Sequence, residues 1–274
     1  MFRINYRLKK PNEIIPWGET NKTLHWFGLT DGLLWIDADD SVIYEYSEVH
    51  TDDNGRPVKY NDYQLSRFLE DFSGIFPYVA ESIPEYLYDS VTTLERDLHR
   101  WETMYLEKSD EDFSRFEDEL FEPLSDLFYN RSLNSSHLIY GPLISCFRCG
   151  EKLKLVWDSD QLNNSNASIW KYPSGTIEME YSDFVAEVSR FFGAFFRDMD
   201  NQVADVVKDG IPGVYIDMDA LVRENKKRKD YFGYQVDMLT SEGLIYTDWD
   251  IVKVSFQKMK PEICSTERQE TKDN

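Results

Sequence analysis

The spacing of the hydrophobic residues changes near residue 61, and this change predicts a fold that contains both strands and helices. Upstream, apolar and polar side chains alternate from Phe2 to Leu8, which is the pattern of a strand with one buried face. Downstream, between Asn61 and Pro77, leucine, phenylalanine and isoleucine recur at the spacing of a helix. We therefore predict the α+β class, in which helices pack against antiparallel sheets.

The stretch from Leu24 to Ile36 contains two tryptophans and predicts a β-hairpin. Its Asp31-Gly32 pair separates two apolar runs, and such a pair readily takes the positive φ angles of a tight type I′ turn. A polar turn at 37–41 and an apolar run at 42–46 predict one more strand. Residues 1–50 are thus expected to form an antiparallel meander.

The middle of the chain predicts helices followed by a second group of strands. Helices are expected within 61–130, and one of them is opened by a capping box at Ser82-Ile83-Pro84-Glu85 and continues to Tyr105. Antiparallel strands are expected near 137–180, with a hairpin around Cys149-Gly150-Glu151.

The last third predicts long amphipathic helices within 182–240, the first of them capped by Ser182-Asp183. Because the apolar faces of all these helices need the sheets to cover them, we expect a single domain from 1 to 260. The polar and aperiodic residues 261–274 are expected to be a flexible tail.

Composition limits the partners that the chain can have. Its formal charge of −21 at pH 7 would repel nucleic acid and anionic membranes, so neither is expected as a partner, whereas a basic protein would be attracted. The three cysteines are too few for a disulfide framework, and the N-terminal residues have no secretory pattern. No run is long and apolar enough to span a bilayer. We expect a cytoplasmic protein.

The most acidic segment lies between Glu107 and Glu122 and predicts a helix with one apolar and one strongly negative face. Such a face can be a solvated surface that serves solubility, or it can be a docking surface for a basic partner. If a partner binds, we expect the contact at six carboxylates: Asp110, Glu111, Asp112, Glu117, Asp118 and Glu119.

No catalytic, metal-binding or cofactor-binding constellation is evident, so no such residue is predicted. Cys146 and Cys149 lack the second ligand pair that a zinc site needs, and on a strand they would point to opposite faces. The four histidines lie in separate segments. Of these, His25 is expected to be structural in the aromatic hairpin, with a role in a site as the alternative.

Several stretches resemble a known family. The run Leu24-His25-Trp26-Phe27-Gly28-Leu29-Thr30-Asp31-Gly32, followed by Trp35-Ile36, resembles the opening signature of the uncharacterised bacterial domain-of-unknown-function family DUF5984. The likeness continues at 60–64, at Gly141-Pro142 before the strand ending in Trp157-Asp158, and at 247–250. It implies one unit over nearly the whole chain and supplies no catalytic residue.

These observations lead to a hypothesis of function and two alternatives. The leading one is a cytoplasmic immunity protein that binds a cognate, basic bacterial toxin and occludes its active site, and that is a monomer or weak dimer. The first alternative is a small hydrolase or transferase with a pocket near His25, Trp26 and Asp31. The second is a regulatory scaffold that associates with itself.

Overall fold

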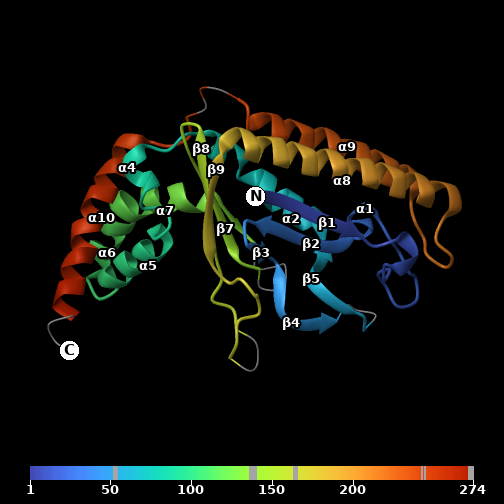
Figure 1. The fold of residues 1–274 in the computed structure, drawn as a ribbon, viewed down its shortest axis with the longest axis horizontal. Helices are drawn as coiled ribbons and strands as arrows, with labels where there is room; N and C mark the ends of the chain where they lie inside the picture. Colours follow the sequence, from blue (N-terminus) through green and yellow to red (C-terminus); the bar gives the residue numbers. More distant parts are fainter. Residues whose placement is uncertain (52–54, 136–140, 163–165, 242, 244, 271–274) are drawn as a thin grey trace.

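The computed structural model describes residues 1–51, 55–135, 141–162, 166–241, 243 and 245–270. Two antiparallel sheets and several helices make up this part of the chain, which confirms the predicted α+β class. Figure 1 shows the second sheet in the middle of the molecule, with α10 (Trp249–Glu270) and shorter helices on one side, and the first sheet with α8 (Tyr181–Asp209) and α9 (Met218–Met238) on the other.

The first sheet has the strand order β1 (Phe2–Leu8), β2 (Asp31–Ala38), β5 (Pro57–Gln64) and β4 (Glu45–Thr51), and β3 (Ser41–Ile43) also pairs with β2. The predicted strand at the N-terminus and the turn before β3 are confirmed, and Asp39 takes a positive φ of 53° in that turn. The sequence did not indicate β5. Because β5 continues to Gln64, the helix expected from Asn61 starts only at Leu65.

The hairpin predicted between Leu24 and Ile36 is wrong, because its first arm is the short helix α1 (Trp26–Leu29). Trp26 and Leu29 lie one helical turn apart and are both buried. Gly32 lies within β2 and pairs with Leu8 and Tyr63. A Cβ on this glycine would lie 2.4 Å from the Arg7 carbonyl oxygen, so Gly32 allows close strand packing instead of forming a turn.

The second sheet has the order β6 (Ser132–Asn134), β7 (Leu143–Cys149), β8 (Lys152–Asp158) and β9 (Gly175–Glu180). The predicted hairpin around Gly150 is confirmed, and this glycine has a φ of +58°. Residues 136–140, which belong to the predicted strand group, lie outside the described part.

Both faces of the second sheet are covered. On β7, Ile144 and Cys146 belong to a large hydrophobic cluster with the first sheet, whereas Phe147 belongs to a second cluster with the C-terminal and middle helices. Neighbouring residues of a strand point to opposite faces, so one strand serves two cores. The prediction of one domain remains a prediction, and the shared sheet is the feature that favours it.

The helices that follow the first sheet are α2 (Leu65–Gly74), α3 (Phe76–Ala80), α4 (Glu85–Tyr88) and α5 (Leu94–Tyr105). The single helix predicted from Ser82 to Tyr105 is therefore interrupted between α4 and α5. The predicted capping box is also wrong, because Pro84 is the N-cap of α4 and the Ser82 hydroxyl instead accepts a bond from the Gly150 amide at 2.9 Å.

The two longest helices of the large cluster are α8 (Tyr181–Asp209) and α9 (Met218–Met238), which confirms the helices predicted within 182–240. The predicted cap at Ser182-Asp183 lies two to three positions too late, because Glu180 is the N-cap of α8. The helix α8 also covers the outer edge of β1: Glu187 accepts the Ile4 amide at 2.7 Å, and Arg190 donates to the Ile4 carbonyl oxygen. An edge closed in this way cannot pair with another strand.

The predicted flexible tail from 261 is wrong as far as Glu270, because α10 (Trp249–Glu270) runs through it with Pro261 inside. Val252, Phe256, Met259 and Ile263 follow at intervals of four and three residues and pack into the second cluster. Residues 271–274 lie outside the described part. Among the described helices, none is both long and apolar enough to cross a membrane.

Candidate functional site

Two features of the surface are candidates for function, and the first is the acidic segment. It forms α6 (Asp110–Phe116), the π-helical turn η2 (Glu117–Phe121) and α7 (Glu122–Tyr129). The predicted helical, two-faced character is confirmed. The six predicted carboxylates are all exposed, and we call them the acidic face: Asp110, Glu111, Asp112, Glu117, Asp118 and Glu119.

The acidic face is held in place by its N-terminal cap and by its buried side. The Ser109 hydroxyl caps α6 by accepting the Asp112 amide at 3.2 Å, and the carboxylates of the first turn are favoured by the helix dipole. On the buried side, the Phe116 ring stacks on Tyr105 with centroids 3.8 Å apart. Arg115 reaches Glu111 at 3.5 Å, which is a weak surface pair. The carboxylates therefore sit on a fixed scaffold with little neutralisation.

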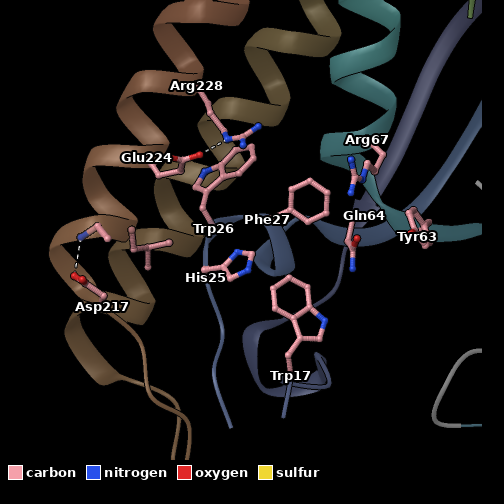
Figure 2. A pocket seen from close by; sticks show the side chains of 12 residues that line it. Trp17, His25, Trp26, Phe27, Tyr63, Gln64, Arg67, Asp217, Glu224 and Arg228 are labelled. Atoms are coloured by element: carbon pink, nitrogen blue, oxygen red, sulfur yellow. Dashed lines mark hydrogen bonds and ion pairs between the residues drawn. The ribbon is translucent and has the colours of Figure 1, made fainter. Parts of the chain in front are cut away.

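The second candidate is a cavity of about 730 Å³, which we call the aromatic pocket. Its walls come from the Trp17 loop, α1, the start of α2 and the first three turns of α9 (Figure 2). The lining residues are Trp17, His25, Trp26, Phe27, Tyr63, Gln64, Arg67, Asp217, Ala220, Leu221, Glu224 and Arg228.

Stacking and hydrogen bonds hold these walls together. The buried Trp26 indole donates to Asn225 Oδ1 at 2.9 Å, which ties α1 to α9. The Arg228 guanidinium lies 4.6 Å from the Trp26 ring centre and forms ion pairs with Glu70 and Glu224. Contacts from three helices thus fix the inner end of the pocket before any ligand arrives.

The residues predicted to share a pocket are only partly brought together. His25 and Trp26 line it, but Asp31 does not, because its carboxylate faces Lys9 at 3.1 Å. His25 lies against Trp17, with ring centroids 4.2 Å apart, and partial burial lowers its pKa below the ordinary value. Its imidazole is therefore neutral at pH 7.

The cysteine pair behaves as its position on a strand predicts. Cys146 is buried in the large cluster, and burial raises its pKa to about 12, whereas Cys149 packs against the second cluster. The two thiols point to opposite faces of β7 and cannot share a ligand. In the described part of the chain, no group of three or more His, Cys, Asp or Glu side chains is arranged to hold a metal ion.

Comparison with known proteins gives a family. The family described as "Family of unknown function (DUF5984)" matches residues 3–254. The chain belongs to DUF5984. No curated protein and no solved structure matches it.

In this DUF5984 protein, the stretches that carry the resemblance lie in three places. Gly141-Pro142 and Trp157-Asp158 lie just before β7 and at the end of β8, in the second sheet. Residues 24–32 and 60–64 are neighbours, since Gly32 pairs with Tyr63, and both contribute to the aromatic pocket. Residues 247–250 lie at the start of α10, where Thr247 donates to Glu81 at 2.7 Å.

The pocket contains residues that the sequence analysis did not single out, above all Trp17, Arg67, Glu224 and Arg228. None of these four residues belongs to a recognisable motif, and all but Trp17 lie far from His25 in the chain. Single tryptophan, arginine and glutamate residues outside any motif are too common in a sequence to indicate a site.

Proposed function

We propose that this DUF5984 protein is a cytoplasmic immunity protein, which binds a basic bacterial toxin and neutralises it by occluding the toxin's active site. The observation that carries the proposal is the acidic face, in which six exposed carboxylates lie on one scaffold whose opposite side is buried. Uncompensated like charges cost stability, so their concentration on one segment is best explained by a partner of opposite charge. The π-helical turn within the segment supports this, because such turns occur frequently at functional sites.

The acidic face would act mainly on the rate of association. Long-range attraction steers a basic partner towards the carboxylates, and this attraction weakens as salt is added. The exposed apolar side chain of Leu106, three residues before the Ser109 cap of α6, would supply part of the contact from which water is excluded.

The test compares two sets of six neutralising substitutions. The first converts the acidic face to Asn and Gln, and the matched control does the same to six exposed carboxylates elsewhere: Glu19, Glu48, Asp205, Asp209, Asp219 and Asp230. The partner is captured from a bacterium that encodes the chain, purified, and used in stopped-flow association and in a growth-protection assay. We expect the first set to slow association by about tenfold or more at low salt and to weaken protection. Intact protection and unchanged association in the first set would exclude this surface.

A small enzyme is the second candidate, because the aromatic pocket contains an exposed, neutral histidine. The measurement is turnover by the purified protein alone on a panel of hydrolase and transferase substrates. Activity that His25→Gln removes would support this candidate, whereas equal activity in both proteins would exclude His25 as its base.

A further inference from the structure

The aromatic pocket lies at the opposite end of the molecule from the acidic face, so an occupant would be independent of the proposed toxin contact (Figure 1). A volume of about 730 Å³ lies within the range of pockets that take small organic ligands. The question is which chemical class fits the groups that line it.

The entrance offers aromatic faces. Trp17 is 37% exposed, and His25 beside it is exposed as well. Phe27 and Tyr63 continue the same wall and are half-buried. Exposed aromatic rings that converge on one cavity favour a planar aromatic ligand, which can stack on them.

The charges of the two arginines are used differently. Arg228 is neutralised by two carboxylates, since it pairs with Glu224 at 2.6 Å and also with Glu70. Arg67 stacks on the Phe27 ring at 4.6 Å, but its NH1 is 4.0 Å from Glu70 Oε2, which is too long for a hydrogen bond. Glu70 is already committed to Arg228, so the guanidinium of Arg67 keeps N–H donors for a ligand.

Gln64 adds a neutral polar group next to this cation. It is the N-cap residue of α2, but its side chain makes no capping hydrogen bond, and Figure 2 shows this side chain on the same wall as Arg67, between the arginine and Trp17. A side-chain amide can both donate and accept hydrogen bonds. The wall therefore presents an aromatic surface, an amide and a guanidinium, in this order across the pocket.

We propose that the aromatic pocket binds a small planar aromatic anion. Its ring stacks on Trp17 and His25, and its carboxylate or phosphate accepts hydrogen bonds from the Arg67 guanidinium. Arginine suits this task because its planar fork matches both anions.

The experiment is isothermal titration calorimetry of the whole chain with two probes, indoleacetate and AMP, each paired with its neutral counterpart, indole or adenosine. We expect saturable binding of at least one anion and much weaker binding of its neutral counterpart. Arg67→Gln should lower the affinity for that anion by about tenfold or more, because a charge-assisted hydrogen bond is lost. Arg223→Gln, which changes an exposed arginine of α9 outside the pocket, should leave the affinity unchanged.

The two probes separate the two sources of this chemistry, since preference for indoleacetate indicates an aromatic carboxylate and preference for AMP a nucleotide. Trp17→Leu provides a second variant and should also weaken binding, with circular dichroism showing that both variants are folded. The proposal is overturned if neither anion binds saturably, if indole and adenosine bind as well as the anions, or if folded Arg67→Gln binds as the wild type does.

Discussion

At the scale of single residues, burial decides the chemistry of the cysteines. Cys146 is fully buried and its pKa is raised to about 12, so almost no thiolate exists at pH 8. Cys264 is exposed on α10. We expect iodoacetamide at pH 8 to modify Cys264 first and Cys146 only after the protein unfolds, as measured by mass spectrometry of tryptic peptides.

The control for this prediction is the same reaction in concentrated urea, where all three cysteines should react alike. Modification of Cys146 at the rate of Cys264 in the native protein would contradict the burial that the structure gives it. The sequence alone predicted opposite faces for Cys146 and Cys149, because a strand fixes that parity. It could not predict which of the two thiols is more deeply buried.

At the scale of elements, the sequence predicted those whose periodicity is uninterrupted. The helices α8 and α9 and the hairpin of β7 and β8 were all predicted, because each pattern continues over its full length. The errors occur where a tertiary contact overrides a local signal. At Gly32 the absence of a side chain allows the neighbouring strand to pack closely, and the Asp31-Gly32 pair lies within a strand and does not form a turn.

The helix α10 is a second such case. A proline usually ends a helix, but Pro261 lies inside this one. The stripe from Val252 to Ile263 has regular helical spacing and packs into the second cluster, which offsets the strain of the proline. Next to it, Glu262 accepts bonds from the Trp101 indole at 2.7 Å and the Tyr105 hydroxyl at 3.1 Å. The periodicity was present in the sequence, and the proline and the polar composition concealed it.

If α10 is part of the core, a truncated side chain on it should cost stability. We expect Ile263→Ala to lower the free energy of unfolding by about 2–5 kcal/mol, because it leaves a cavity under a residue that is 5% exposed. The neighbouring Cys264→Ala is the matched control and should have little effect. Urea denaturation measures both, and equal stability of the two variants would mean that this part of the chain is a tail after all.

For the candidate sites, the sequence predicted the exposed position of the six carboxylates of the acidic face, because charge pattern and helical period are local properties, and their role in binding stays a prediction. Of the aromatic pocket it predicted only His25 and Trp26, since Arg67 and Arg228 approach α1 from helices that begin more than thirty residues later in the chain. Ring stacking and ion pairs across that separation have no signature in one sequence.

At the scale of the whole molecule, a buried ion pair connects three segments that lie far apart in the chain. Arg131, just after α7, and Glu81, the C-cap of α3, are almost fully buried and meet at 2.8 Å. Glu81 also accepts the amides of Tyr246 and Thr247 at 3.2 Å each, and Arg131 lies 5.7 Å from the Trp249 ring centre. One carboxylate thus connects the middle helices to the segment that leads into α10.

Removing that carboxylate leaves a buried guanidinium without its counter-charge, so Glu81→Ala should lower the free energy of unfolding by about 3–5 kcal/mol. In the double variant Glu81→Leu with Arg131→Met no charge is left buried, so part of the stability should return, although the Tyr246 and Thr247 amides still lack their acceptor. Glu180→Ala, which breaks the exposed pair with Lys152, is the control and should change little. Urea denaturation monitored by tryptophan fluorescence and by circular dichroism measures all three.

The same measurement tests whether the two clusters unfold together. Because Trp101 and Trp157 lie in different clusters that share the second sheet, fluorescence and circular dichroism should give one coincident transition in the wild type. Separate transitions would show that the clusters unfold as independent units, and a loss in Glu81→Ala no larger than in the control would show that the buried pair does not join them.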